Sequence, residues 1–462
     1  MNPPFAVHHV EMEHLPEALP HPSTSDGAYV VFWAHGVPLG HRLIPSSALP
    51  MSPAMLRAYA YPAIAPAVAH YNEQTANLRS TTDTIYTNTI DTDTIDTNTL
   101  SAIKHLLQNP SRLTSKPRYT STDASVVICT RDRPEHLAAC LHAIAALTPA
   151  PAEVIVVDNA PQTDATRRLV ATRPGVRYVH EPRPGLDIAR NTGVRTSTKP
   201  IIAFTDDDVR VDPQWLRYLC AGFDAPDVMA VTGLVLPATL DTEPQYLFEM
   251  HWGFHRGYLP RRFDAAYMKA HRSRCAPVWD IGAGASMAFR RDAFMHVGGF
   301  DERLDVGAAG CSGDSELWYR ILADGWTCHY TPMAVAHHTH RTTASGLRRQ
   351  LEAYMRGHTA ALLVQYERHG HHGLLRRLFA SLPKYYLRRL IAGARHGYQG
   401  RYQTLAAEIR GALSGVLFYL RTPAASPEHL FASVATGAEA EAEPERPALT
   451  KSSPQASSPQ AA

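Results

Sequence analysis

Strand-like and helix-like patterns alternate along residues 123–340, and this alternation constrains the fold more than any other feature of the chain. Apolar residues with helical spacing separate four short β-branched runs, at residues 125–129, 153–157, 175–179 and 200–204. The first helix-like segment opens at Pro134, and proline is favoured in the first turn of a helix. The pattern predicts a mostly parallel α/β sheet covered by helices, with ligands at the carboxyl ends of its strands.

Further units flank this segment, because 462 residues exceed the length of one ordinary domain. Residues 1–75 contain two strand-like runs and a helix-like stretch, which predicts a small α+β appendage. Residues 76–122 are a Thr/Asp-rich linker, and residues 123–344 are the expected catalytic domain. Residues 345–422 are predicted to be a basic helical extension. The composition of residues 423–462 predicts disorder.

A five-residue repeat, TIYTN-TIDTD-TIDTN, lies within the linker. Three repeats are too few to stack into a solenoid with its own core. We interpret the repeat as an expanded linker; the alternative is a local cation site that uses Asp91, Asp93 and Asp96.

Charge and cysteine usage limit the class of protein. The formal net charge of +2 gives no global field, so no nucleic-acid partner is expected. The six cysteines form no CxxC pair, which indicates a reduced, cytoplasmic setting. The N-terminal residues lack a basic segment followed by an apolar stretch, so no signal peptide is expected. No window reaches about 18 uninterrupted apolar residues, so no spanning helix is expected.

Three consecutive carboxylates, Asp206, Asp207 and Asp208, follow the fourth strand-like run. Such close like charges repel one another, and a divalent cation is their natural partner. Because Asp206 and Asp208 share one side of an extended segment, they are the predicted ligands of Mg²⁺ or Mn²⁺ that also binds substrate phosphates. The alternative is a solvated acidic turn before a helix at Asp212.

Asp158 ends the second strand-like run. Its carboxylate can accept hydrogen bonds from a nucleotide base or a ribose hydroxyl; the alternative is an Asx turn that closes the strand. Acids at two strand ends of one sheet favour a ligand site.

Seven segments occur in an order that is typical of a known family: CTRDRP, VVDNAP, PGLDIARNTG, FTDDDVRVDP, GAGASMAFRRDAF, GDSELWYRILADG and AVAHHTHR. They resemble family 2 glycosyltransferases of the GT-A fold, a Rossmann-like fold, over about residues 123–345. The resemblance implies an inverting, metal-dependent enzyme that uses a nucleoside-diphosphate sugar, with UDP as the expected nucleotide. The acceptor would be a glycan or lipid-linked molecule in polysaccharide or glycoconjugate biosynthesis.

The resemblance also assigns roles to residues. It implies donor contacts by Thr130, Asp158, Arg190 and Asp206. It implies a Mn²⁺ or Mg²⁺ site made by Asp206, Asp208 and His338. The turn that borders the sugar and the acceptor would contain Gly284, Ala285 and Ser286. Asp314 takes the place of the general base.

Some of these positions have alternatives. Asp314 could instead cap the helix that starts near it, and His340 and His337 lie beside His338 in the late motif. The family usually has Glu where this chain has Gly313, and Asn where it has Ser286. These departures leave the class of acceptor open.

The basic extension suggests a second kind of partner. Residues 345–421 hold 13 Lys/Arg and three Glu, a net charge of +10, with arginine pairs between apolar residues at helical spacing. This pattern predicts contact with an anionic membrane surface, hence a protein that is peripheral on the inner face of the membrane. The alternative is that the apolar residues pack on the catalytic domain.

Other functions fit the sequence less well. A catalytically inactive GT-A-fold protein that binds glycans or serves as a scaffold is the main alternative. A nucleotidyltransferase would need a glycine-rich phosphate loop, whereas CTRDRP has no glycine. A metallohydrolase would need a regular set of three His or carboxylate ligands.

Overall fold

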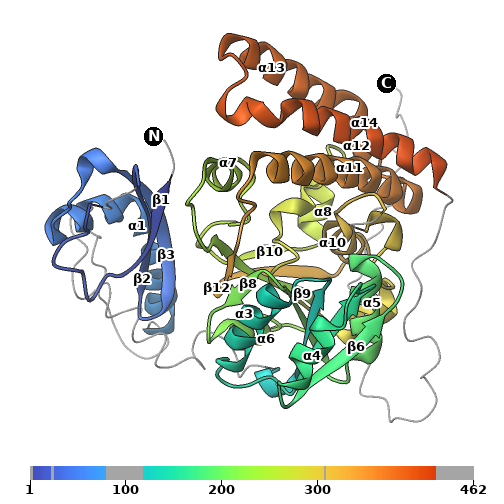
Figure 1. The fold of residues 1–462 in the computed structure, drawn as a ribbon, viewed down its shortest axis with the longest axis horizontal. Coiled ribbons are helices and arrows are strands. Elements are labelled where there is room, and N and C mark those ends of the chain that lie inside the picture. The colour runs from blue at the N-terminus through green and yellow to red at the C-terminus, as the bar shows by residue number, and fades with distance from the viewer. Residues whose placement is uncertain (1–3, 22–24, 80–117, 306–307, 423–462) are drawn as a thin grey trace, which may run out of the picture.

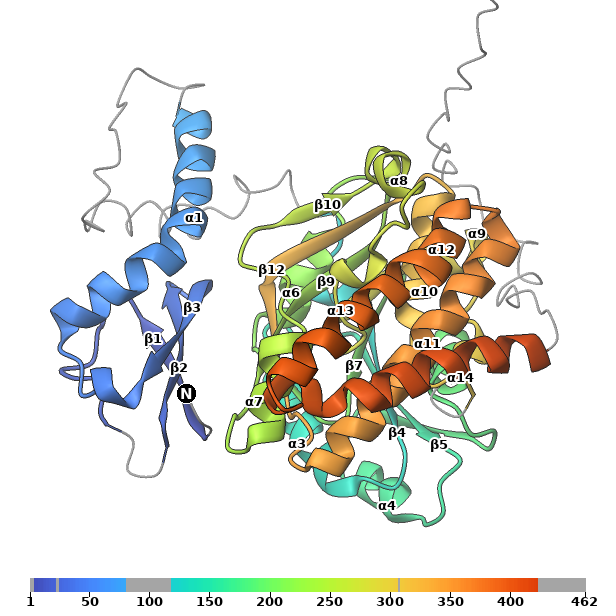
Figure 2. The same cartoon turned by 90° about the horizontal axis from the view of Figure 1, so that it is seen from above.

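The structure is a computed structural model that describes residues 4–21, 25–79, 118–305 and 308–422 (Figure 1). The linker repeat with its candidate cation ligands Asp91, Asp93 and Asp96 lies outside these residues, as do the rest of 80–117 and the tail 423–462. The described chain forms a small N-terminal unit, a large sheet covered by helices and a C-terminal set of helices (Figures 1 and 2).

The large sheet has nine strands, eight of them in the order β10-β12-β9-β11-β7-β4-β5-β6, with β8 beside β12. Strands β7, β4, β5 and β6 pair in parallel, and β12 pairs in parallel with β9. Strand β11 runs antiparallel to both of its neighbours. The predicted mostly parallel α/β sheet is therefore confirmed. The strands are β4 (Ala124–Thr130), β5 (Glu153–Asn159), β6 (Val176–Glu181), β7 (Ile201–Asp206), β8 (Val209–Val211), β9 (Val228–Pro237), β10 (Arg261–Phe263), β11 (Met287–Arg290) and β12 (Thr327–His338).

Helices cover both faces of this sheet, so all seven residues of β4 are buried and apolar residues alternate between two cores. Val126 packs with residues of α3 and α6, whereas Val127 packs with residues of α5, α9 and α10. The helices are α3 (Pro134–Ala145), α4 (Ala165–Ala171), α5 (Leu186–Thr196), α6 (Trp215–Ala221), α7 (Glu243–Trp252), α8 (Ala265–His271), α9 (Arg291–His296) and α10 (Gly313–Ala323).

The N-terminal unit is an α+β unit with one more strand than predicted. It comprises β1 (Phe5–Glu11), β2 (Gly27–Ala34), β3 (Val37–Pro45) and α1 (Pro53–Arg79). Strand β1, which the sequence analysis missed because its polar histidines obscure the alternation, pairs in parallel with β2. One face of β2, with Tyr29, Val31 and Trp33, is buried in the same core as α10.

The C-terminal extension is helical, as predicted, and lies over α7 and α10 (Figure 2). Among the described helices none is long and apolar enough to cross a membrane. The helices are α11 (Ala344–His369), α12 (His372–Arg376), α13 (Leu382–Arg395) and α14 (Leu405–Arg421).

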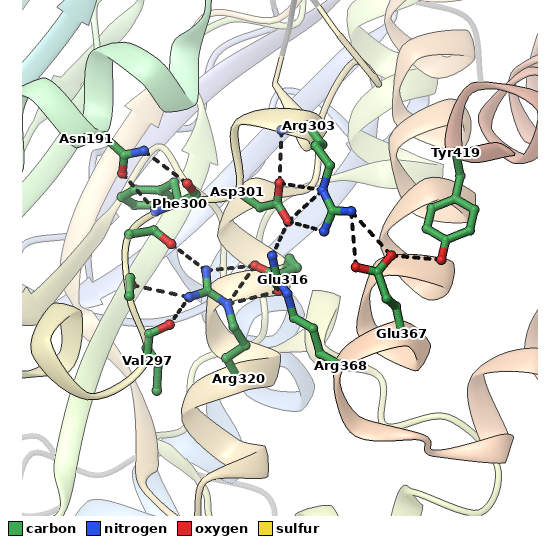
Figure 3. A network of polar contacts seen from close by, with 12 residues as sticks. Asn191, Val297, Phe300, Asp301, Arg303, Glu316, Arg320, Glu367, Arg368 and Tyr419 are labelled. Atoms are coloured by element: carbon green, nitrogen blue, oxygen red, sulfur yellow. Dashed lines mark hydrogen bonds and ion pairs between the residues drawn. The ribbon is translucent and has the colours of Figure 1, made fainter. Parts of the chain in front are cut away.

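A network of charged side chains joins this extension to the large α/β domain (Figure 3). Arg303 contacts Asp301 at 2.9 Å and Glu367 of α11 at 3.3 Å. Arg368 of α11 reaches back to both Asp301 and Glu316. Helix α11 is therefore fixed by ion pairs as well as by apolar packing.

Candidate active site

Three of the predicted donor contacts lie at one edge of the sheet. Thr130 ends β4, Asp158 lies at the end of β5 and Asp206 ends β7. Thr130 is opposite Asp158 in the register, and its neighbour Cys129 is opposite Asp206. The structure brings these residues together because parallel strands present their carboxyl ends at the same edge.

The middle acid of the run, Asp207, points into the protein. Its Oδ2 accepts a hydrogen bond from the Thr130 hydroxyl at 2.7 Å, and Arg133 contacts its other oxygen. Burial raises the pKa of Asp207 to about 7 against the attraction of Arg133. The Thr130 side chain is buried too, and its hydroxyl is occupied by the hydrogen bond to Asp207.

Asp158 is fully buried, and its two carboxylate oxygens differ in their contacts. The Tyr178 hydroxyl donates to Oδ2 at 2.9 Å, whereas Oδ1 has no hydrogen bond of ordinary geometry within the described chain. Burial raises the pKa of Asp158, and the Tyr178 and Thr166 side chains act against that rise. A buried acceptor without a donor is costly, and a nucleotide N–H or hydroxyl would satisfy it.

Asp208 meets His338 because of one strand pairing. Strand β8 begins directly after the acidic run and pairs antiparallel with β12, which places Val209 opposite His338. Asp208 Oδ1 then lies 3.6 Å from His338 Nε2, while its Oδ2 accepts from Arg133 Nη1 at 3.0 Å. Both side chains are buried, at 8% exposure each.

The electrostatics of this pair suit a hard divalent cation. Burial favours a raised pKa for Asp208, but the guanidinium groups of Arg133 and Arg341 hold that pKa below its ordinary value. Burial lowers the pKa of His338 to about 4, so its imidazole is neutral. A carboxylate oxygen and a neutral imidazole nitrogen are both ligands of Mn²⁺. No group of three or more His, Cys, Asp or Glu side chains placed to hold a metal ion occurs in the described part of the chain.

Asp206 faces Arg190 rather than His338. Arg190 Nη2 lies 3.8 Å from Asp206 Oδ1, and its Nη1 bonds to Asp187 Oδ1 at 3.0 Å. Burial raises the pKa of Asp206 to about 6. Arg190 is itself buried, and its positive charge offsets the negative charges of Asp187 and Asp206. The roles of Arg190 in donor binding and of Asp206 as a second metal ligand stay predictions.

Asp314 is the second residue of α10, and Ser312 is the N-cap. The capping alternative therefore does not explain Asp314. Its Oδ2 accepts the Gly284 N–H at 2.9 Å, and its Oδ1 accepts the Ser315 N–H at 2.7 Å. The half-buried carboxylate is thus oriented against the predicted acceptor-side turn.

A second acid lies beside Asp314, and the sequence analysis missed it. A Cβ on Gly313 would lie 1.9 Å from Asp187 Oδ2, an oxygen that is buried without a hydrogen-bond partner among the described residues. Asp187 of α5 therefore occupies the space in which the side chain of the family's usual Glu would begin. The only signal in the sequence was the acid within PGLDIARNTG.

The turn before β11 presents its backbone to the site. The Gly284 N–H faces Asp314, and the Ala285 carbonyl accepts from the Thr205 hydroxyl at 3.0 Å. The Ser286 hydroxyl is fully buried and accepts from the Trp215 indole at 2.8 Å, so it is directed into the core and not toward the acceptor.

Neighbouring side chains on a strand point to opposite faces of the sheet, so His337 and His338 face different parts of the molecule. His337 faces the N-terminal unit, where its ring lies 5.1 Å from that of His9. His338 faces Asp208, and its Nδ1 lies 2.9 Å from His340 Nδ1.

The sequence is similar to those of known glycosyltransferases. Residues 125–298 match the family model described as Glycosyl transferase family 2. A glucosyl-dolichyl phosphate glucuronosyltransferase of Haloferax volcanii is 27% identical, over 38% of this chain and 55% of its own. The succinoglycan biosynthesis protein ExoM of Rhizobium meliloti is 29% identical, over 46% and 64%. An uncharacterized glycosyltransferase of Mycobacterium tuberculosis is 33% identical, over 40% and 74%.

Among solved structures, the mannosyltransferase PcManGT from Pyrobaculum calidifontis, in complex with GDP-Man and Mn²⁺, is 18% identical with a TM-score of 0.46, over 77% of this chain and 98% of its own. The chain spans between 43% and 55% of the length of the first curated relatives it matches. The sheet of this chain and the acids at its strand ends define an α/β protein of the glycosyltransferase class.

The chain belongs to family 2 of the glycosyltransferases.

Proposed function

We propose that this chain transfers a sugar from a nucleoside-diphosphate sugar to an acceptor hydroxyl with inversion at the anomeric carbon. The observation that carries the proposal is the grouping, at one sheet edge, of an unpartnered Asp158 oxygen, the Asp208–His338 pair and Asp314 on its helix. A glycan-binding protein without turnover would have no need for the last two.

Asp158 would bind the nucleotide, since its unpartnered Oδ1 can accept from a base N–H or a ribose hydroxyl, with UDP as the proposed nucleotide. Asp208 and His338 would hold Mn²⁺ or Mg²⁺, with Asp206 as a further predicted ligand. The bound cation would stabilise negative charge on the departing diphosphate as a Lewis acid.

Asp314 would take the proton of the acceptor hydroxyl. A general base must lie within about 2.6 to 3.2 Å of that proton's oxygen, and the two backbone N–H groups on Asp314 hold its carboxylate in one orientation. One displacement from the face opposite the leaving group gives inversion.

The acceptor would be a glycan or a lipid-linked molecule. Two relatives support this, since their names contain a dolichyl phosphate and a polysaccharide, succinoglycan. We further propose that the C-terminal extension rests on an anionic membrane surface at the inner face. Seven apolar side chains between 38% and 71% exposed lie on its helices: Phe379, Leu387, Leu390, Ile391, Leu413, Leu417 and Leu420.

A screen of nucleotide sugars tests the main proposal. We expect one donor to be hydrolysed slowly and to raise the unfolding temperature in Mn²⁺, because a ligand that binds only the folded state stabilises it. Asp208→Ala should lose nucleoside-diphosphate binding, which calorimetry measures. Equal affinity of the wild type in EDTA and in Mn²⁺ would contradict the metal site, and a retained anomeric configuration in the product would contradict inversion.

A further inference from the structure

We propose that the N-terminal unit completes the active site: Tyr29 of β2, through Glu249 and His340, holds the His338 ring with its Nε2 facing the metal position. The inference rests on the proposed function, since His338, the residue that these side chains position, is a ligand of the proposed metal. Tyr29, Glu249 and His340 would be positioning residues that act through His338.

The four side chains form one continuous chain of contacts. The Tyr29 hydroxyl donates to Glu249 Oε1 at 3.3 Å. Glu249 Oε2 lies 3.0 Å from His340 Nε2. His340 Nδ1 lies 2.9 Å from His338 Nδ1, and His338 Nε2 lies 3.6 Å from Asp208 Oδ1. The chain runs from a strand of the N-terminal unit, through α7, to the end of β12.

Each contact in this chain joins groups that can hydrogen-bond. The Glu249 carboxylate has one oxygen on the Tyr29 hydroxyl and the other on His340 Nε2. The Nδ1 atoms of His340 and His338 face each other, so the His338 ring is held in one orientation with its Nε2 toward Asp208. Outer partners of this kind fix the orientation of a histidine that binds a metal.

Burial keeps water away from this chain of contacts. Tyr29 is 0% exposed, Glu249 and His340 are 3% exposed, and His338 is 8% exposed. Water therefore cannot replace a missing partner cheaply, and an unsatisfied buried carboxylate is costly. Only the Asp208 end of the chain is next to the proposed metal position.

The N-terminal unit is also anchored where α7 supplies Glu249. The Phe5 ring stacks on Tyr246 of α7 with centroids 5.0 Å apart, and the Phe5 N–H donates to the Leu240 carbonyl at 2.8 Å. Tyr29 itself stacks on His41 of β3 with centroids 4.8 Å apart. The packing of the N-terminal unit on α7 thus sets the position of the Tyr29 hydroxyl.

Calorimetry with Mn²⁺ and UDP on the full-length chain tests the inference. Loss of an outer partner of a metal ligand typically lowers metal affinity about 10- to 100-fold. We expect Glu249→Gln to weaken Mn²⁺ binding about 10-fold or more. We expect Tyr29→Phe to weaken it a few-fold, because the Tyr29 bond to Glu249 is long, at 3.3 Å, and lies furthest from His338. Unfolding temperatures verify that the variants are folded.

Two controls separate positioning from general stability. Trp33→Phe removes a hydrogen bond to His9 on the same face of β2 and should leave Mn²⁺ affinity unchanged. In a His338→Ala background, Glu249→Gln should cause no further loss, because it acts only through His338. Wild-type affinity in folded Glu249→Gln and Tyr29→Phe, or an additive loss in the His338→Ala background, overturns the inference. A wild type that binds no Mn²⁺ overturns the proposed metal site itself and the inference with it.

Discussion

At the residue scale, the chemistry of the site depends on how two carboxylates beside Gly313 are held. Asp314 is fixed by two backbone N–H groups, whereas one oxygen of the buried Asp187 has no hydrogen-bond partner in the described structure. Burial raises the pKa of Asp187 well above its ordinary range. The oriented acid, Asp314, therefore suits proton transfer, and Asp187 suits a fixed position beside it.

Asp314→Asn should leave donor affinity within a few-fold and lower the rate of transfer about 10²-fold or more, since general-base catalysis contributes roughly 10² to 10⁴. The amide keeps the size of the side chain but cannot take a proton. Single-turnover kinetics with the identified donor measure the rate, and calorimetry measures the affinity. Full activity in this variant would mean that another group accepts the proton.

Gly313→Ala should destabilise the protein and impair transfer, because the added Cβ would lie 1.9 Å from Asp187 Oδ2. Removal of Asp187 relieves this contact, so Asp187→Ala combined with Gly313→Ala should be more stable than the sum of the single changes indicates. Contacting residues show coupling of about 0.5 to 3 kcal/mol. Urea unfolding of the four proteins gives the coupling, and strict additivity would mean that the two residues do not meet.

At the element scale, the strands that sequence patterns predict well are the ones that carry the predicted donor contacts. Thr130, Asp158 and Asp206 could be placed at one edge because continuous apolar runs separated by helices impose parallel pairing. The pairing of β8 with β12 could not be predicted: β8 has three residues, too few for a periodic signal, yet it brings His338 to Asp208. Asp187 and Gly313 likewise meet only through tertiary packing.

Arg368→Met should destabilise the protein by about 3 kcal/mol, since removal of one partner from a buried ion pair leaves charge uncompensated. Arg368 is the residue of α11 that contacts both Asp301 and Glu316, although Arg303 and Arg320 still contact these acids. Urea unfolding measures the loss. The control is Arg395→Met at the exposed end of α13, which should change stability by less than about 0.5 kcal/mol. Equal effects would show that the network in Figure 3 contributes nothing.

At the scale of the whole molecule, the region that matches the family model, residues 125–298, is flanked by two further units that the family model does not cover. The N-terminal unit shares a core with α10, and the C-terminal helices are joined to the domain by buried charges. The appendage was expected from the sequence but its purpose was not, because Tyr29 and Glu249 are 220 residues apart. The C-terminal helices keep an outer surface with both apolar and basic side chains exposed.

The full-length chain should co-sediment with anionic vesicles at low salt through this outer surface. On α14, Leu413, Leu417 and Leu420 are between 51% and 71% exposed and share one side with Arg410 and Arg421 by helical spacing. A groove of about 770 Å³ between α13 and α14 continues this apolar side. Each basic residue near an anionic surface contributes about 1 kcal/mol, and binding should weaken at about 0.5 M salt as the Debye length shrinks.

Substitution of these three leucines by glutamine should abolish co-sedimentation, because the buried apolar area supplies the attraction that salt does not screen. Arg167→Gln with Arg168→Gln, on the exposed side of α4 away from the extension (Figure 1), is the matched control for charge and should bind as the wild type does. Neutral vesicles should retain little protein at any salt concentration. A full-length chain that stays in the supernatant with anionic vesicles at low salt would show that these helices serve packing alone, and the acceptor should then be sought among soluble glycans.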